Sequence, residues 1–246
     1  MKKILSVLLV LCMMLAVVAC NNTPETTPES TPAETPAETP ENNGVKVMTY
    51  AEYDAAAMDA EVVIEAYVQA TQSWWDNKIT AYLQDKDGAY FAYEMACTEE
   101  NAAKLTKGTK IRVSGVKGSW AGEIEIMEAT FEFIDGADTW VAEAMDATAL
   151  LGTDDLIKHQ NKFVSFKGLT IDKITYKNEG GDDIYVDVKK DDKVYSFCVE
   201  RYLTSPDTDV YKAFADLKAG DIVDIEGFLY WYEGVNTHIT AVAKAQ

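Results

Sequence analysis

The sequence predicts a mainly β protein with short helices, in which two copies of one strand pattern follow an export signal and a stalk. Two observations lead to this fold class. Short apolar runs of strand length, bounded by turn residues, fill the chain beyond residue 44. The same order of runs then occurs a second time. Hydrophobic residues make up 48% of the chain and aromatic residues 11%, which is enough to form packed cores.

The chain is strongly acidic, with 22 Lys and Arg against 41 Asp and Glu and a net charge of -19. This balance argues against a nucleic-acid-binding protein and against docking on anionic lipids, because both need clustered basic side chains. The two histidines, His159 and His238, have no Cys, Asp or Glu at a metal-ligand spacing. No nucleophile elbow, phosphate-binding loop or zinc-protease motif occurs. We therefore expect no metal, no cofactor and no enzymatic activity.

The N-terminal segment has the order of an export signal. Two lysines precede the apolar range 4–19, which is shorter than the roughly 20 residues that a membrane-spanning helix needs. This range ends in Val-Val-Ala before Cys20, and the pattern resembles a bacterial lipobox. The resemblance implies that residues 1–19 are a signal peptide and that Cys20 carries the lipid, with palmitate as one acyl chain. An ordinary signal peptide or an uncleaved anchor is the alternative interpretation.

A stalk of residues 20–43 is expected to follow. Prolines recur there at every fourth position from Pro24 to Pro40, each after a threonine, and no large apolar residue interrupts them. Such a tract cannot be buried, so it predicts a disordered, partly polyproline II spacer. The protein is then expected at the cell membrane, lipid-anchored on its extracytoplasmic face. A proline-rich docking motif is the alternative.

An internal repeat divides the remainder into two predicted domains, 44–138 and 139–246. The segment 105–115 aligns without a gap with 217–227, and both contain a leucine, a glycine, a β-branched run and a second glycine. Each copy is expected to contain a short helix, three strands, a second helix and two more strands. In copy one we expect helix 49–58, opened by a capping box at Thr49, strands 61–71, 78–85 and 89–95, a helix from Thr98, and strands 109–116 and 123–134. In copy two we expect helix 153–160, strands 162–173, 183–189 and 193–200, a helix from Ser205, and strands 221–230 and 235–243.

Three strands, a helix and two strands are the order of an OB-fold, a five-stranded Greek-key barrel. Gly115 and Gly227, in the fourth strands, fit the sharp bend that such a small barrel needs, and Gly108 and Gly220 are placed to end the preceding helices. Two β-sandwich modules are the alternative, but these need about seven strands each and no central helix. The sequence therefore predicts two tandem OB-fold-like barrels.

The whole arrangement resembles tandem OB-fold surface lipoproteins of Gram-positive, gut-type bacteria. The similarity is carried by the stretch from Met48 to Gly115, and it extends to copy two only by pattern. This functionally uncharacterised group implies a fold and a location, and it implies no active site.

Aromatic residues fall in the loops that flank the usual OB-fold binding face, formed by strands two and three. Indole and phenol rings stack on sugars or bases, so these residues are the ligand-binding candidates. The alternative is that individual tryptophans fold inward and plug the barrels. The candidates are Trp74, Trp75 and Trp120 in copy one, and Tyr176, Trp231 and Tyr232 in copy two.

Weaker signals have structural interpretations. The segment 85–88 resembles part of a calcium loop but is expected to be a hairpin turn, as are the acids at 182–183 and 191–192, for which a weak calcium site is the alternative. Cys97 and Cys198 are expected to be buried free thiols, His159 solvated, and His238 half-exposed on a strand. One basic cluster is present, and it consists of Lys104, Lys107, Lys110, Arg112 and Lys117.

These patterns lead to one favoured function and two alternatives. The favoured hypothesis is a surface-tethered, non-catalytic lipoprotein whose two modules bind a glycan or a peptide. One alternative is a structural or protein-interaction role in the envelope. The other is single-stranded nucleic-acid binding through the OB-folds, which the acidic charge makes the least favoured partner.

Overall fold

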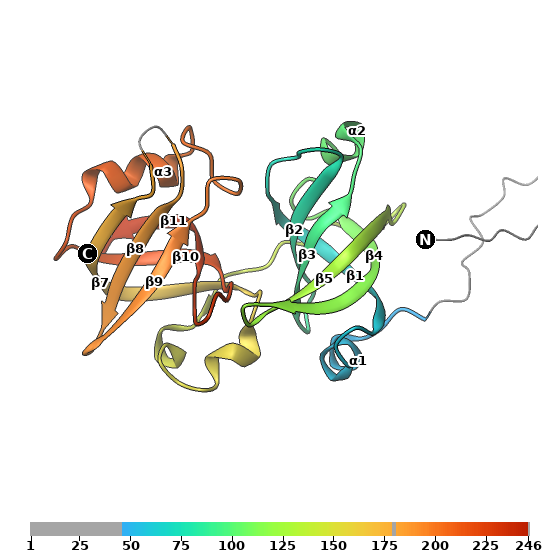
Figure 1. Ribbon diagram of the computed structural model, residues 1–246, viewed down its shortest axis with the longest axis horizontal. Coiled ribbons are helices and arrows are strands. Elements are labelled where there is room, and N and C mark those ends of the chain that lie inside the picture. Colours follow the sequence, from blue (N-terminus) through green and yellow to red (C-terminus); the bar gives the residue numbers. More distant parts are fainter. Residues whose placement is uncertain (1–45, 179–180, 246) are drawn as a thin grey trace, which may run out of the picture. The chain divides into compact units, whose positions relative to one another are not determined.

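The computed structural model describes residues 46–178 and 181–245 (Figure 1). The predicted signal peptide, the lipid-carrying Cys20 and the stalk lie outside these residues, so they stay predictions. Among the residues that are described, no helix is both long and apolar enough to cross a membrane.

The first half folds as a closed five-stranded barrel, as predicted. Helix α1 (Tyr50–Ala55) precedes it, and helix α2 (Glu99–Ala102) lies between the third and fourth strands. The strands pair in the order β1-β2-β3-β5-β4, and β4 closes the barrel on β1 (Figure 1). They are β1 (Glu61–Thr71), β2 (Lys78–Gln84), β3 (Ala89–Ala96), β4 (Lys110–Trp120) and β5 (Glu123–Phe133).

The predicted capping box opens α1. The Thr49 hydroxyl accepts a hydrogen bond from the Glu52 N–H, and the Glu52 carboxylate accepts one from the Thr49 N–H at 2.9 Å. Two backbone donors at the start of the helix are thereby satisfied.

The second half forms a six-stranded sheet in the order β10-β11-β9-β8-β7-β6, with a further pairing of β10 to β7. The parallel contact of β11 with β9 corresponds to that of β5 with β3 in the first barrel. Strand β6 was not predicted, because two residues are too short for an alternating pattern. The strands are β6 (Met145–Asp146), β7 (Phe163–Tyr176), β8 (Ile184–Lys190), β9 (Lys193–Val199), β10 (Ile222–Phe228) and β11 (His238–Lys244).

The helices of the second half differ from the prediction. In place of an α-helix over 153–160 there are two 3-10 helices, η1 (Thr148–Leu150) and η2 (Leu156–His159), and neither has a side-chain cap. Helix α3 (Asp209–Ala213) begins after Thr208, whose hydroxyl caps it, and not at Ser205, and the short 3-10 helix η3 (Phe214–Asp216) follows. The capping hydroxyl, not the proline beside Ser205, fixes where this helix starts.

The two repeat glycines before the fourth strands have equivalent structural roles. Gly108 and Gly220 have φ angles of +91° and +90°, a region that favours glycine. Their N–H groups donate to the carbonyls of Val68 on β1 and Ile171 on β7. Neither directly follows a helix, so the prediction that they end the helices is wrong, although the left-handed backbone it assumed is present.

The glycines within the fourth strands permit a close approach of the fifth strand. A Cβ added to Gly115 would lie 2.6 Å from the Met127 carbonyl oxygen, and one added to Gly227 would lie 2.2 Å from that of His238. Both glycines lie where the pairing register shifts. A glycine at such a bulge allows the tight bend of a small closed sheet.

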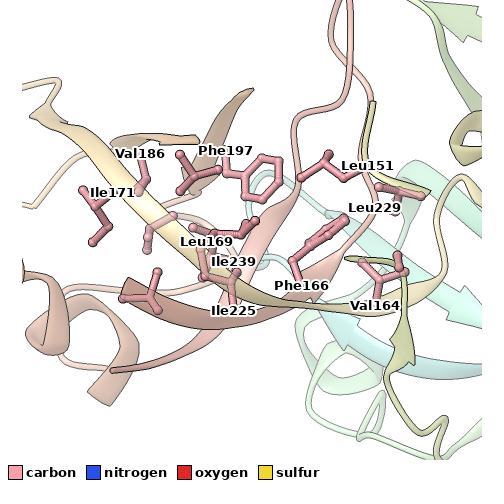
Figure 2. Packing of buried hydrophobic residues seen from close by; sticks show 14 of the residues in the cluster. Leu151, Val164, Phe166, Leu169, Ile171, Val186, Phe197, Ile225, Leu229 and Ile239 are labelled. Atoms are coloured by element: carbon pink, nitrogen blue, oxygen red, sulfur yellow. The ribbon is translucent and has the colours of Figure 1, made fainter. Parts of the chain in front are cut away.

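Each half buries its own hydrophobic core. The core of the first barrel includes Ile64, Leu83 and Ile111. Figure 2 shows the second core, where Leu169, Ile225 and Ile239 lie close to the aromatic residues. The rings of Phe166 and Phe197 are 5.2 Å apart.

A third, aromatic cluster joins residues of both halves and buries His238. The Tyr82 hydroxyl on β2 lies 2.6 Å from Nδ1 of His238 on β11, and the Tyr230 ring stacks on the imidazole. His238 is only 7% exposed, so the prediction of a half-exposed residue is wrong. Its environment includes side chains from the other half of the chain, which strand periodicity does not reveal. Burial lowers the pKa of His238 to about 3.

Cys97 and Cys198 are both buried free thiols, as predicted. Burial raises the pKa of both, which keeps them protonated and unreactive at neutral pH.

Candidate ligand-binding groove

Two predicted loops present the most exposed tryptophans. Trp75 lies between β1 and β2, where Asp76 and Asn77 adopt left-handed φ angles and Trp75 forms a β-bridge with Lys78. Trp120 is the last residue of β4, before the tight turn into β5. Their side chains are 71% and 63% exposed, which is unusual for tryptophan in a folded protein.

These loops border a groove along β2 and β3 of the first barrel. A pocket of about 450 Å³ is lined by Trp75, Tyr93 and Tyr202, and a pocket of about 710 Å³ by Tyr93, Trp120 and Tyr230. Both pockets also include Lys78 and Glu94, so they are neighbouring parts of one concavity. We refer to the two pockets together as the aromatic groove. Their volumes fall within the usual range of small-molecule sites.

Two of the residues that line both pockets form an ion pair. Lys78 Nζ lies 2.7 Å from Glu94 Oε2. This hydrogen bond lowers the pKa of Glu94 and raises that of Lys78. Glu94 has a positive φ and its N–H donates to the Thr80 hydroxyl, at a point where the pairing register of β2 and β3 shifts. Both groups are therefore charged at neutral pH.

Two further carboxylates border the wider pocket. Glu125 on β5 is 5% exposed, and burial, with the nearby Glu94 charge, raises its pKa. Glu128 is exposed and has a left-handed backbone. The aromatic groove thus combines flat apolar rings with acidic groups.

The two neighbouring tryptophans of the first loop, Trp74 and Trp75, lie in different environments. The Trp74 indole N–H donates to the Cys97 carbonyl at 2.8 Å, and the ring packs on the core of the barrel. Trp74 therefore acts as the plug that was the alternative interpretation, while Trp75 points outward.

The candidates in the second half do not line the aromatic groove. Trp231 packs partly against the second core, and its backbone N–H donates to Glu123. Tyr176 and Tyr232 are exposed, and the Tyr176 ring is 6.5 Å from that of Tyr211. The six candidates thus divide into a pair at the groove and four elsewhere.

Most of the polar groups in the groove were not predicted from the sequence. Lys78, Tyr93 and Glu94 lie on the predicted second and third strands, so the outward-facing residues of those strands are the signal that could have identified them. Neither Glu125 nor Tyr202 could be identified in this way. The burial of Glu125 is not evident from the sequence, and Tyr202 lies in the segment after β9.

The predicted basic cluster is largely occupied by contacts within the barrel. Lys110 and Arg112 both pair with Glu65, and Lys104 pairs with Glu100. Lys117 is 4% exposed and donates to the carbonyls of Tyr53, Asp54 and Ala56. These contacts leave few cations on this surface for phosphate groups.

The acidic turns have structural roles. One Asp85 oxygen accepts from the N–H groups of Asp87 and Gly88, and the other accepts from the Tyr90 hydroxyl. Asp183 accepts from Lys177 and from the Arg201 N–H. His159 is only partly exposed, and burial lowers its pKa, so it is not the fully solvated residue expected. Within the described ranges, no three His, Cys, Asp or Glu side chains converge on a possible metal position.

Comparisons with known proteins give remote fold similarities. No family model matches the chain, and neither does any curated protein. The p204 HINb domain is 13% identical, with a TM-score of 0.33 over 74% of this chain and 95% of that chain. The Ifi202 HINa domain in complex with 20bp dsDNA is 12% identical, with a TM-score of 0.35 over 76% and 100%. The p202 HIN1 domain in complex with 12-mer dsDNA is 13% identical, with a TM-score of 0.34 over 85% and 100%.

Proposed function

We propose that this protein is a surface-tethered, non-catalytic binding lipoprotein, and that the aromatic groove of its first barrel takes a glycan or a peptide. The observation that carries the proposal is the exposure of Trp75 and Trp120, one in each of the two neighbouring pockets, with Tyr93 lining both pockets. Exposed rings along one concavity suit an extended ligand with repeated apolar faces, such as a chain of sugars.

We also propose that the second sheet is a second OB-fold-like module. It repeats the pairing order of the first barrel, with β7, β8, β9, β11 and β10 in the places of β1, β2, β3, β5 and β4. The equivalent glycines before and within the fourth strands support the same conclusion. Its exposed Tyr176 and Tyr232 would lie outside the aromatic groove, which is the better-defined site.

The two alternatives predict different behaviour of the same groove. An envelope-interaction role predicts a protein partner that competes with glycans for it. Single-stranded nucleic-acid binding predicts retention at low salt that is lost as salt rises. The ion pairs of Lys110 and Arg112, and the carboxylates of the groove, favour an uncharged or cationic ligand over a polyanion.

Removing the groove tryptophans tests the proposal. Trp75→Ala and Trp120→Ala should each weaken binding of the preferred ligand from a panel of cell-wall glycans and peptides by about fivefold or more, since a stacked ring contributes roughly 1–3 kcal/mol. Isothermal titration calorimetry measures the loss. Tyr176→Ala and Tyr232→Ala are matched controls, because both remove exposed rings outside the groove. Unchanged affinity in both tryptophan variants would contradict the proposal, and binding of oligonucleotides alone would favour the nucleic-acid alternative.

We further propose that Cys20 is the lipid-bearing N-terminus of the mature protein. Cys20→Ser should abolish lipidation, leaving precursor or releasing the protein from the membrane fraction, because two or three acyl chains are needed for stable anchoring. Mass spectrometry and membrane fractionation measure both effects. Cys12→Ser is the control, since that residue lies within the predicted signal peptide. If mass, processing and fractionation are unchanged in Cys20→Ser, the lipobox interpretation is wrong.

A further inference from the structure

The wider pocket of the aromatic groove has the features of a site for an organic cation. Three aromatic side chains line it, from Tyr93, Trp120 and Tyr230. The faces of such rings carry partial negative charge and attract ammonium groups. Tyr230 is held in place by His238, on which it stacks at 4.2 Å, and by the Phe91 ring at 5.2 Å.

The position of Glu125 is a second, independent feature that points to a cation in this pocket. Its side chain is almost fully buried, yet it borders this pocket. Within residues 46–178 and 181–245, no hydrogen bond or ion pair joins its carboxylate to another side chain. Its carboxylate oxygens are not among the fully buried side-chain atoms that lack a partner, so they keep some contact with solvent and are open to a counter-charge, whose attraction is strengthened by the burial of the rest of the residue. The pocket is where such a group can reach it.

The charge balance of the pocket favours a cation over an anion or a second carboxylate. Among the described residues that line the pocket, Lys78 is the only basic one, and its ammonium is already paired with Glu94. Glu125 and Glu128 then remain on the same wall. An entering anion would meet both of these carboxylates, whereas an ammonium group would be attracted by the carboxylates and by the rings.

We propose that the wider pocket is a subsite for an ammonium-bearing group of the ligand, held between the Trp120 and Tyr93 rings and paired with Glu125. This inference rests on the proposed binding function and names the chemistry of one ligand position. Three sources share that chemistry: a choline substituent, an amino sugar without its acetyl group, and a lysine side chain of a peptide.

Pairs of charged and neutral probes test the subsite on the folded protein. The pairs are choline with 3,3-dimethylbutan-1-ol, glucosamine with N-acetylglucosamine, and Nα-acetyl-lysine amide with its Nε-acetylated form. NMR titration or calorimetry should show preferential binding of the cation in at least one pair, and the pair that responds identifies the source. Equal binding within every pair, or no binding of any cation at millimolar concentration, would overturn the proposal.

Glu125→Gln is the decisive variant, because it removes the charge and keeps the shape. It should weaken binding of the preferred cation by about tenfold or more, as expected for a desolvated cationic contact, and leave the neutral probe unaffected. Glu226→Gln, at an exposed carboxylate on β10, should change nothing. Full cation binding by Glu125→Gln would overturn the proposal. If the unmodified protein shows no preference for the cation in any pair but still binds glycan in a tryptophan-dependent way, the subsite alone is overturned and the proposed function stands.

Discussion

Replacing Lys117 with methionine is expected to lower the free energy of unfolding by about 2–4 kcal/mol. One buried and two partly buried carbonyls lose a charged donor, and only the fully buried carbonyl bears the whole cost of roughly 1–3 kcal/mol. The Lys117 ammonium donates to three carbonyls at the end of α1, those of Tyr53, Asp54 and Ala56, at 2.9, 2.8 and 3.0 Å. It also lies 5.0 Å from the centre of the Tyr53 ring. A cation at the C-terminal end of a helix complements its dipole, and methionine keeps only the packing.

Chemical denaturation of the variant measures this loss. Lys104→Met is the matched control within the same predicted basic cluster, since Lys104 makes only an exposed pair with Glu100. That variant should change stability by less than about 0.5 kcal/mol. Similar small losses in both variants would show that Lys117 is not the donor that anchors α1 to β4.

Replacing Glu123 with glutamine is expected to stabilise the protein above pH 8 and to change little near pH 5. Glu123 on β5 has no exposed surface, and burial raises its pKa to about 8. Its Oε2 accepts a hydrogen bond from the Trp231 N–H at 2.8 Å, which a glutamine oxygen can retain. Between pH 4.5, the ordinary pKa of a glutamate, and about pH 8, the folded protein holds a proton that the unfolded chain has released. Stability therefore falls as pH rises through this window.

The measurement is urea unfolding of both proteins from pH 5 to pH 9. At the upper end the variant should be more stable by several kcal/mol, with an upper limit of about 5 kcal/mol from roughly 1.4 kcal/mol per pKa unit. His238 does not interfere above pH 6.5, because its lowered pKa affects stability only between about 3 and the ordinary histidine value of 6.5. Glu61→Gln, at an exposed strand residue, is the control. Parallel pH profiles for wild type and Glu123→Gln would contradict burial of an ionisable Glu123.

The strands of both halves could be predicted from their apolar residues, which either alternate with polar residues or form a continuous run that faces a core. The range 61–71 coincides with β1, and the ends of most other strands differ by a few residues. The short helices were harder, since single hydroxyl caps such as Thr208 decide where they begin. Strand β6 and the burial of His238 depend on pairing with distant segments, which local patterns do not contain.

The aromatic groove could be predicted in part. The loop positions of Trp75 and Trp120 follow from strand order, so their place near the β2–β3 face was accessible from the sequence. The sequence did not reveal which of the adjacent Trp74 and Trp75 turns inward, because the inward position of Trp74 depends on a hydrogen bond to the Cys97 carbonyl. Glu125 could not be found either, since a strand glutamate is ordinarily a solvated residue.

The indole N–H resonances of the five tryptophans give the most direct test of the groove as the binding site. In a two-dimensional NMR titration with the preferred glycan or peptide, the signals of Trp75 and Trp120 should shift. The signal of Trp74, which is hydrogen-bonded to Cys97, should stay in place. The same holds for Trp140, whose ring lies 5.5 Å from that of Tyr67 outside the groove, and for Trp231, which packs on the second core. A ligand that binds while the Trp75 and Trp120 signals remain fixed would contradict the assignment of the aromatic groove as the binding site.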